Sequence, residues 1–346
     1  MNHLVIMAGG IGSRFWPMST PDKPKQFVDV LGTGRTLIQL TVDRFKNICA
    51  PEQIWIVTSK NYIEWIHQQL PEIPQENILL EPCMRNTAPC IAYVTWKIKE
   101  RDPEANLVIS PADHVVMDTE CFRRVIREGL EFSNDADRIV TVGIMPHRPE
   151  TGYGYIKAGI DVEQEHFYKV EAFKEKPSRE VAQQYIDEGG YYWNSGIFIW
   201  SAKTIEKAFR AFQPALASIF DQISGRFYTS DEQVLIDEHY QQCEKISIDY
   251  AVMEHADNIY VIPASFGWSD LGTWGSLYEL SGKDTTKNAV IGDSIRMIDS
   301  ENCIVSVPNG KRCILEGLDG YIVVDNNKSL LICKKENEQH IKEWIE

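Results

Sequence analysis

The chain has 346 residues, of which 43% are hydrophobic and 25% are charged, and these proportions are typical of a globular protein with room for two domains. Acidic residues outnumber basic ones by 50 to 35, and the net charge of −15 argues against general nucleic-acid binding, which favours basic surfaces. No apolar run approaches the length of a membrane span, and the eight cysteines include no Cys-x-x-Cys pair, so we expect neither membrane insertion nor a structural zinc site.

The chain opens on an apolar run, Leu4–Met7, which predicts a buried strand and leads at once into a glycine-rich loop. The glycines of this loop are Gly9, Gly10 and Gly12. Glycine allows a tight turn and lets backbone N–H groups approach a bound group closely. Two cations, Arg14 and Lys25, flank the loop. A glycine loop with cations beside it, placed after the first strand, suits a phosphate chain.

This loop matches neither of the two commonest nucleotide-binding patterns. A dinucleotide fingerprint requires a third glycine where Phe15 stands, and a P-loop requires a Gly-Lys-Ser or Gly-Lys-Thr ending that does not follow Gly12. The sequence therefore argues against a dinucleotide dehydrogenase and against a P-loop ATPase. An ordinary glycine-rich turn between a strand and a helix is the remaining alternative, and Arg14, Pro17 and Lys25 weaken it.

Residues 1–145 alternate short apolar runs with longer helical stretches. The runs predict strands at Leu4–Ala8, Ile54–Thr58, Ile78–Glu81, Leu107–Ser110 and Ile139–Gly143. The stretches between them predict helices near residues 36–47, 60–70, 88–101 and 119–132. This alternation predicts a doubly wound, mostly parallel sheet, in which ligands lie beyond the carboxyl ends of the strands. Loops that follow different strands should therefore meet at one edge of the sheet.

The second half of the chain changes character near residue 285. Up to that point, we expect strands at Tyr153–Ala158 and Gly196–Trp200, and helices near residues 178–188, 202–212, 247–256 and 271–280. From about residue 288, very short apolar runs alternate with turn residues, which is typical of a small all-β unit. Its expected strands are Ile295–Ile298, Cys303–Val307, Cys313–Glu316, Tyr321–Val324 and Leu330–Cys333, and Glu336–Ile345 should form a terminal helix.

A series of motifs, in the same order along the chain, resembles one family. The motifs are Ala8–Pro17, Pro24–Phe27, Glu81–Pro89, Ser110–His114, Pro149–Tyr155, Glu175–Pro177, Trp193–Phe198 and Gly267–Gly272. The set resembles the sugar nucleotidyltransferases and, among them, the mannose-1-phosphate guanylyltransferases. The match covers most of the first 280 residues, and the ordered set is far more specific than any single motif.

The resemblance implies an α/β fold with a Rossmann-like, doubly wound mixed sheet of the nucleotide-diphospho-sugar transferase type. It implies a catalytic domain over residues 1–284 and a small left-handed β-helix-like domain with a terminal helix over 285–346, used in dimer contacts. It also implies GTP and mannose 1-phosphate as substrates, with GDP-mannose and diphosphate as products. A phosphomannose isomerase domain, which some relatives add, is not expected. We expect a cytoplasmic location, because no basic leader opens the chain and the cysteines are scattered. The resemblance implies a homodimer. The negative net charge and the lack of a long apolar run argue against binding to nucleic acid or membrane.

The reaction implied by the resemblance needs cations and a metal ion. The sugar phosphate is already an anion, so the enzyme must position two polyanions and stabilise charge rather than supply a base. We expect Arg14 to bind the triphosphate and Lys25 to neutralise the reacting phosphates. Asp113 and Asp270 match the family's metal ligands and suit Mg²⁺, which takes few protein carboxylates beside phosphate and water. The alternatives are solvated surface cations for Arg14 and Lys25, a turn carboxylate for Asp113, and a helix N-cap for Asp270.

The substrate-binding residues follow from the same motifs. For the nucleotide, the resemblance implies Gly9, Gly10, Gly12, Arg14, Arg85, Asn86, Thr87 and Ser110. For the sugar phosphate, it implies Tyr153, Gly154, Glu175, Lys176 and Asn194. Ordinary packing is the alternative for Tyr153, and a surface ion pair is the alternative for Glu175 and Lys176.

Two other functions remain open at this point. One is the same chemistry with another sugar 1-phosphate or another nucleotide, because pocket shape decides that selectivity. The other is a non-catalytic subunit that senses sugar nucleotides. The presence of Arg14, Lys25, Asp113 and Asp270 argues against the sensor, since a sensor does not need the metal ligands and the cations of the transition state.

Overall fold

The computed structural model describes the chain except residues 11, 165 and 346. The chain divides into two compact units, and each contains segments that are distant in sequence. Unit 1 consists of Met1–Gly9, Asp43–Ala112 and Val116–Trp268. Unit 2 consists of Gly10–Val42, Asp113–Val115 and the chain from Ser269 onward. The domain boundary that we expect near residue 285 stays a prediction.

Unit 1 is built on one nine-stranded sheet with the order β3-β2-β1-β4-β9-β6-β10-β8-β7. Its strands are β1 (Asn2–Met7), β2 (Ile54–Ser59), β3 (Ile78–Glu81), β4 (Asn106–Pro111), β6 (Ile139–Ile144), β7 (Gly154–Gln164), β8 (Phe167–Glu175), β9 (Tyr191–Ser201) and β10 (Ile259–Ala264). Strands β1 to β4 are parallel, whereas β9 runs antiparallel to both β4 and β6. The sheet is therefore mixed, as the resemblance implies, and the five strands expected before residue 145 are all present.

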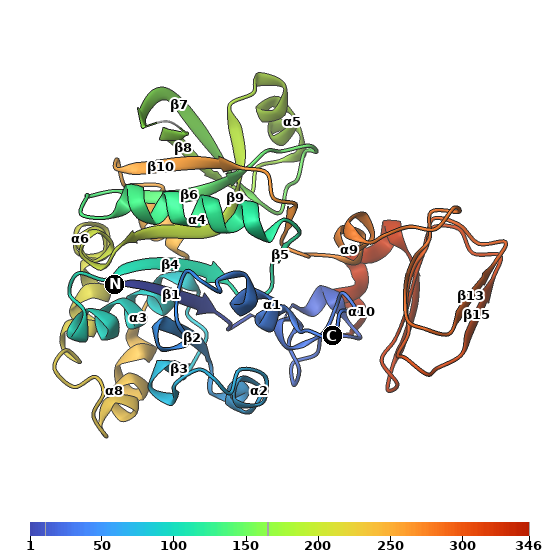
Figure 1. Cartoon of the computed structure of the whole chain (residues 1–346), viewed down its shortest axis with the longest axis horizontal. Helices are drawn as coiled ribbons and strands as arrows, with labels where there is room; N and C mark the ends of the chain where they lie inside the picture. Colours follow the sequence, from blue (N-terminus) through green and yellow to red (C-terminus); the bar gives the residue numbers. More distant parts are fainter. Residues whose placement is uncertain (11, 165, 346) are drawn as a thin grey trace. The chain divides into compact units, whose positions relative to one another are not determined.

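Helices cover both faces of this sheet. In β9, Phe198 and Trp200 belong to the core formed with α3 (Thr87–Arg101) and α6 (Ala202–Phe212). Ile199 between them points to the opposite face, because successive strand side chains alternate. There it contacts Gly129 of α4 (Thr119–Ser133), which lies along the sheet in Figure 1. The doubly wound arrangement is confirmed.

Other elements of the chain complete the two units. The further helices are α1 (Leu37–Arg44), α2 (Ile63–Gln69), α5 (Arg179–Glu188), α7 (Pro214–Asp221), α8 (Glu232–His239) and a π-helical turn at Asp249–Met253. Two short strands are β5 (Val115–Val116) and β11 (Trp268–Ser269). The helix expected near residues 247–256 is thus a π-helical turn. Strands β8 and β10 and helices α7 and α8 have no counterpart among the expected elements.

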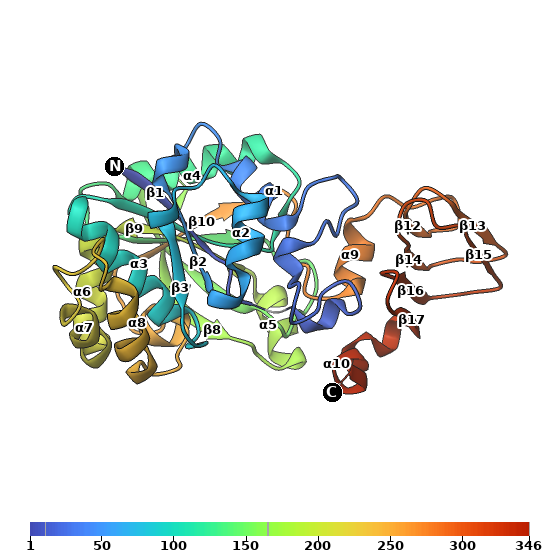
Figure 2. The ribbon, with the colours of Figure 1, turned by 90° about the horizontal axis from the view of Figure 1, so that it is seen from below.

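Unit 2 contains a β-helix-like stack at its C-terminal end (Figure 2). Strands β12 (Ala289–Ile291), β14 (Ile304–Ser306) and β16 (Tyr321–Asp325) pair in parallel, and β17 (Leu330–Lys334) closes that sheet antiparallel. A second parallel pair joins β13 (Ile295–Ile298) to β15 (Cys313–Glu316). The expected small all-β unit is confirmed. The expected terminal helix consists of a 3₁₀ segment, Lys335–His340, followed by α10 (Ile341–Ile345).

The core of unit 2 combines the start and the end of the chain. Phe15 and Leu37 pack in one apolar cluster with Trp274 of α9 (Trp274–Leu280), Ile304 of β14 and Ile341 of α10. Helix α9 begins three residues later than expected, and its N-cap is Thr273, whose side chain accepts a hydrogen bond from the Ser276 N–H. Asp270 is therefore not the N-cap of this helix.

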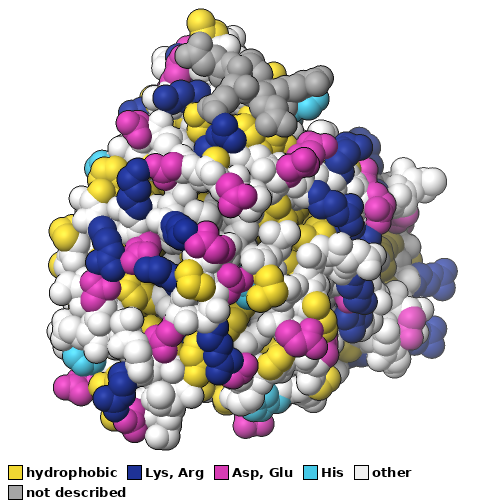
Figure 3. Space-filling model, turned by 60° about the vertical axis from the view of Figure 1, so that its left-hand side comes forward, with side chains coloured by type: hydrophobic (Ala, Val, Ile, Leu, Met, Phe, Trp, Pro, Cys, Tyr) yellow, Lys and Arg dark blue, Asp and Glu magenta, His cyan; other side chains and the backbone are white. Residues whose placement is uncertain are grey.

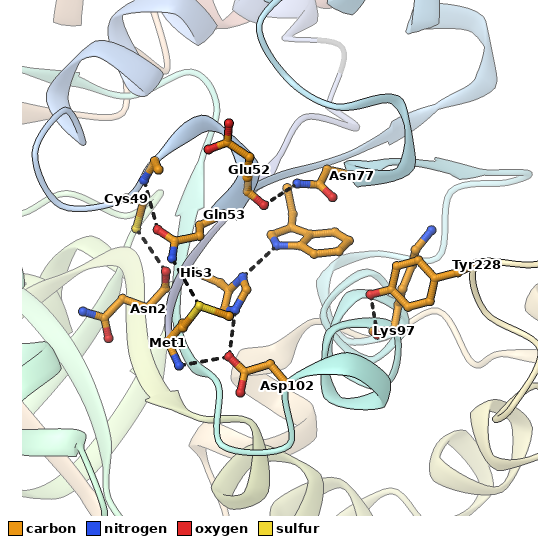
Figure 4. A network of polar contacts seen from close by, with 12 residues as sticks. Met1, Asn2, His3, Cys49, Glu52, Gln53, Asn77, Lys97, Asp102 and Tyr228 are labelled. Atoms are coloured by element: carbon orange, nitrogen blue, oxygen red, sulfur yellow. Dashed lines mark hydrogen bonds and ion pairs between the residues drawn. The ribbon is translucent and has the colours of Figure 1, made fainter.

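A polar network anchors the first strand of unit 1 (Figure 4). The Met1 ammonium lies 2.9 Å from Asp102, and His3 Nε2 lies 3.1 Å from the same carboxylate oxygen. The indole N–H of Trp55 donates to His3 Nδ1 at 3.1 Å, so Nε2 carries the ring proton and donates to Asp102. Burial lowers the pKa of His3 despite the Asp102 carboxylate, and the neutral ring fits this hydrogen-bond pattern.

The surface is mixed in charge. On the face drawn in Figure 3, basic and acidic side chains are interspersed. The negative net charge is therefore not gathered there into a single patch. None of the helices in the described chain is long and apolar enough to cross a membrane.

Candidate active site

The glycine loop passes from unit 1 to unit 2 between Gly9 and Gly10. Gly12 has φ +69°, and a Cβ atom there would lie 2.7 Å from Lys25 Cβ. Only glycine combines this left-handed backbone with so close an approach. The Gln26 side chain donates to the Gly10 carbonyl at 3.0 Å, which ties the loop to the segment that carries Lys25. Arg14 lies on a 3₁₀ turn, Ser13–Phe15, with an exposed side chain.

Lys25 is a buried cation surrounded by oxygen atoms of unit 2. Its Nζ lies 2.9 Å from Asp113 Oδ2 and donates to the backbone carbonyls of Asp270 and Leu271 at 2.8 and 3.0 Å. The side chain is only 5% exposed, and it also lies over the Phe15 ring. A solvated surface lysine is therefore excluded. The structure brings three of the predicted catalytic positions, 25, 113 and 270, into one contact.

The two predicted metal ligands have different surroundings. Burial alone would raise the pKa of Asp113, but the charges of Lys25 and His114 outweigh it and hold the pKa below its usual range. Asp113 is a third exposed. The Asp270 carboxylate folds back over its own turn, where Oδ1 accepts from the Gly272 N–H at 2.9 Å. Both side chains are carboxylates, the kind of hard oxygen ligand that Mg²⁺ prefers.

Among the described residues of the predicted motifs, three that are not glycine have a backbone in the left-handed region. They are Asn86 (φ 68°), Lys176 (φ 47°) and Leu271 (φ 46°). For residues other than glycine, such conformations cost on the order of 1–3 kcal/mol each and cluster at functional sites. Leu271 is the residue whose carbonyl accepts from Lys25, so the strained backbone directs that oxygen toward the cation.

Glu81 is a residue that the sequence-based site omitted. It ends strand β3, is 8% exposed, and accepts a hydrogen bond from the Tyr240 hydroxyl at Oε1. Its other oxygen lies against Gly9, where an added Cβ would be 3.1 Å from it. Burial raises the pKa of Glu81 to about 7, against the opposing effect of the Tyr240 hydrogen bond. Its place at the start of the Glu81–Pro89 motif was the available signal.

The loop after β3 holds its own shape through the residues predicted to bind nucleotide. Asn86 caps helix α3 by accepting from the Thr87 N–H at 3.0 Å, and the Thr87 hydroxyl accepts from the Ile248 N–H at 2.8 Å. Arg85 donates to the Gln241 carbonyl at 2.5 Å. Ser110, near the end of β4, is buried and donates to the Pro111 carbonyl. In unit 1 these side chains stabilise the loops, and Asn86 caps the N-terminus of the 15-residue helix α3.

The predicted sugar-binding residues form one cluster in unit 1. Gly154 opens β7 opposite Glu175 at the end of β8, and a Cβ on Gly154 would lie 2.5 Å from Glu175 Oε2. The same Cβ would contact Asn194 at 3.4 Å. Lys176 Nζ pairs with Glu175 Oε1 at 2.9 Å, while Glu175 itself is only 11% exposed. The alternative of a surface ion pair therefore holds in part: the pair is present and Lys176 is 62% exposed, whereas Glu175 is largely buried.

Tyr153 lies beside this cluster as a packed aromatic residue. Its ring meets Trp193 and Trp268 edge-on, at centroid distances of 5.2 and 5.3 Å. Its carbonyl accepts from the Lys176 N–H at 3.2 Å. The structure places Tyr153 as a support for the Lys176 backbone.

A second unpredicted residue, Asp249, joins the sugar cluster. Its Oδ1 accepts from Asn194 Nδ2 at 3.0 Å. The sequence offered only an expected helix at this position, so no motif drew attention to it.

In the part of the chain that the structure describes, no three His, Cys, Asp or Glu residues are grouped so as to hold a metal ion.

Comparison with known proteins places this geometry in a family. Residues 3–287 match the family described as nucleotidyl transferase, and residues 293–346 match the mannose-phosphate isomerase/GMP-like β-helix domain. The chain belongs to the nucleotidyl transferase family and is an enzyme of that class.

Its relatives define a narrower group. The chain is 36% identical to mannose-1-phosphate guanylyltransferase 2 of Escherichia coli O157:H7, over 99% of this chain and 72% of that protein. It is 36% identical to the alginate biosynthesis protein AlgA of Pseudomonas aeruginosa, over 99% of this chain and 71% of AlgA. A Thermus thermophilus crystal structure, described as a mannose-1-phosphate geranyltransferase, superposes with a TM-score of 0.89 at 30% identity, over 99% of this chain and 98% of that one.

Proposed function

We propose that this enzyme transfers a guanylyl group from GTP to α-D-mannose 1-phosphate. A phosphate oxygen of the sugar attacks the α-phosphorus of GTP in line, the bond from that phosphorus to the bridging oxygen breaks, and diphosphate leaves. The observation that carries the proposal is the similarity, along 99% of the chain, to proteins named mannose-1-phosphate guanylyltransferase. The strands, motifs and unit structure described above are compatible with that reaction.

We assign the phosphate chemistry to residues of unit 2. Lys25, already held among oxygen atoms, would offset charge at the reacting phosphates by exchanging a carbonyl partner for a phosphate oxygen. The exposed Arg14 would bind the triphosphate through its planar guanidinium. The turn at Gly12 supports the loop between them.

We propose that the divalent metal of this family is Mg²⁺ in this enzyme, held by Asp113 and Asp270. The donor set fits, since both carboxylates are hard ligands and Mg²⁺ completes its coordination with phosphate and water. When bound, Mg²⁺ neutralises phosphate charge and orients the triphosphate. Lys25 keeps Asp113 ionised and fixed in place, because their ion pair favours the charged carboxylate.

We assign base and sugar binding to residues of unit 1. Gly9 and the loop at 85–87 would bind the nucleoside, and Glu81 would accept hydrogen bonds from the N–H groups on the guanine edge. Gly154, Glu175, Lys176 and Asn194 would bind the sugar phosphate, with Lys176 at its phosphate. Tyr153 and Ser110 support these sites through the contacts described above.

We also propose that the enzyme acts in the cytoplasm as a homodimer and binds neither nucleic acid nor membrane. All eight cysteines are free thiols, which suits a reducing compartment. Apolar side chains remain exposed on the β-helix-like stack, including Ile314, Leu330 and Ile332, and these are candidates for contacts with a second copy. Sedimentation of the purified protein tests the dimer.

A panel of nucleoside triphosphates and sugar 1-phosphates, each tested with Mg²⁺ while diphosphate release is followed, tests the reaction. We expect GTP with mannose 1-phosphate to give the highest kcat/KM. A better pair would assign the enzyme to a related nucleotidyltransferase. No turnover with any pair, together with binding of GDP-mannose, would instead indicate a sugar-nucleotide sensor.

A further inference from the structure

Asp249 is a half-buried carboxylate that none of the predicted motifs contains. It is the first residue of the π-helical turn Asp249–Met253. Such turns are rare in proteins, and those that occur often lie at functional sites. Besides its contact with Asn194, Asp249 is close enough to the charges of Glu175 and Lys176 for both to affect its pKa. Burial raises the pKa of Asp249 to about 6, with a further contribution from Glu175 and opposition from Lys176 and Asn194.

The contacts of Asn194 allow only one orientation of its amide. Its Oδ1 accepts from the backbone N–H of Gly196 at 3.1 Å, and that N–H can only donate. Its Nδ2 donates to Asp249 Oδ1 at 3.0 Å, and an ionised carboxylate can only accept. Rotating the amide by half a turn would place like groups together at both ends. One proton of Nδ2 remains for another partner.

We propose that Asp249 is a positioning residue of the sugar-phosphate site, which fixes the Asn194 amide so that it offers an N–H donor to a sugar hydroxyl. The inference rests on the proposed function, because it requires a sugar 1-phosphate at this cluster. Glu175 Oε2, which lies against Gly154, offers the complementary acceptor. The site then selects a sugar on which one hydroxyl accepts from Asn194 and a second donates to Glu175.

Three variants test the role of Asp249. Asp249→Ala removes the acceptor, Asp249→Asn can still offer an amide oxygen to Asn194, and Glu254→Gln alters an exposed carboxylate just after the same turn. Binding of mannose 1-phosphate is measured by calorimetry, with and without an α,β-methylene analogue of GTP, beside the kinetics of diphosphate release.

We expect Asp249→Ala to raise the Kd and the KM for mannose 1-phosphate about tenfold or more, while the KM for GTP changes less than about twofold. Asp249→Asn should recover most of the loss, and Glu254→Gln should match the wild type. The Asp249→Asn variant should bind more weakly than the wild type at pH 7.5 and approach it at pH 5, where the wild-type carboxyl is protonated. The phosphate of mannose 1-phosphate titrates in the same way with both proteins, so its effect cancels when the Kd of the variant is divided by the Kd of the wild type at each pH.

Deoxyfluoro mannose 1-phosphates supply a second readout, because fluorine cannot donate a hydrogen bond. Fluorine in place of the hydroxyl that faces Asn194 should leave binding largely intact, because that hydroxyl only accepts. Fluorine in place of the hydroxyl that faces Glu175 should weaken binding, because that hydroxyl must donate. If Asp249→Ala raised the KM for mannose 1-phosphate and the KM for GTP equally, or changed neither, the inference would be overturned. Wild-type binding without turnover would contradict the proposed function alone, whereas no wild-type binding of mannose 1-phosphate would overturn both.

Discussion

The Lys25 ammonium and the Asp113 carboxylate lie 2.9 Å apart, although the two residues are 88 positions apart in the sequence. The ion pair is completed by two backbone carbonyls, those of Asp270 and Leu271. Three hydrogen-bond donors of the ammonium thus meet three acceptors, and the buried charge is fully compensated. This arrangement joins three predicted catalytic positions, so we expect substitutions of Lys25 and of Asp270 to impair catalysis.

Replacing Lys25 by Met keeps the length of the side chain and removes its charge. We expect kcat for diphosphate release to fall about 10²–10³-fold, because a preorganised cation at developing charge contributes about 3–4 kcal/mol. Lys46→Ala is the matched control, since Lys46 is 66% exposed. Wild-type turnover in a folded Lys25→Met protein would contradict the assignment.

Asp270→Asn tests the second metal ligand. The amide oxygen can still accept from the Gly272 N–H, so the turn should persist and the free energy of unfolding should change by less than about 1 kcal/mol. Loss of the charge should lower turnover about a hundredfold or more and raise the Mg²⁺ concentration needed for half-maximal rate.

Removal of metal from the wild type with EDTA should abolish diphosphate release, and added MgCl₂ should restore it. Asp299→Asn, an exposed acidic position in the same unit, provides the control. An unchanged Mg²⁺ requirement in Asp270→Asn would remove this residue from the metal site.

Gly154→Ala should impair sugar binding without unfolding the protein. The added methyl group would lie 2.5 Å from Glu175 Oε2, so the carboxylate must move by roughly an ångström to reach an ordinary contact distance. We expect the KM for mannose 1-phosphate to rise about 10–100-fold, since displacements of this size are costly at a binding site. The KM for GTP should hardly change.

Gly282→Ala is the control for that variant, because a Cβ at Gly282 meets no atom within 4 Å. Steady-state kinetics with each substrate varied in turn distinguishes the two KM values. An equal rise in both, or a normal KM for the sugar phosphate, would show that Glu175 does not bind the sugar from its present position.

Glu81→Gln should change how stability depends on pH. The pKa of Glu81 is raised from 4.5 to about 7 in the folded protein, so the folded state binds its proton more tightly than the unfolded state. Stability is therefore lost as pH rises from about 4.5 through 7. The full loss from this residue is on the order of 3 kcal/mol, because the pKa shift of about 2.5 units corresponds to about 1.4 kcal/mol per unit.

Denaturant unfolding at pH 5 and pH 8 provides the measurement. Glu81→Gln should lose less stability than the wild type between these values, whereas the exposed control Glu72→Gln should behave as the wild type. Parallel pH dependences in Glu81→Gln and the wild type would mean that Glu81 is ionised without cost in the folded state.

Local patterns predicted the fold well over the first 145 residues, where the strands stand out as apolar runs. The strands from β1 to β6 in the sheet of unit 1 carry continuous apolar runs, because they are buried on both faces. Strand β8 was missed since its burial alternates between buried and exposed residues over a mixed polar sequence. The sequence around Asp249–Met253 predicts a regular helix instead of the observed π-helical turn, because one extra residue per turn leaves no mark in the composition.

The candidate site could be predicted only as far as its motifs reach. The motifs predict that Lys25, Asp113 and Asp270 act together on the phosphates and the metal ion, and the three residues are in contact in the structure. The role of Glu81 depends on Tyr240, 159 residues away, and on the closeness of Gly9. That of Asp249 depends on a hydrogen bond to Asn194 across 55 residues. Such contacts are products of tertiary packing, which spacing along the chain does not encode.

The core of unit 2 has a consequence for the order in which this chain can fold. Phe15 and Leu37 leave the ribosome long before Trp274, Ile304 and Ile341, against which they pack. During synthesis, the apolar residues beside the glycine loop therefore cannot complete their packing until nearly the whole chain has been made. The sheet of unit 1, in contrast, needs only residues up to 264. Contacts so distant in sequence form late and slowly. The glycine loop, although synthesised early, is thus expected to become ordered last.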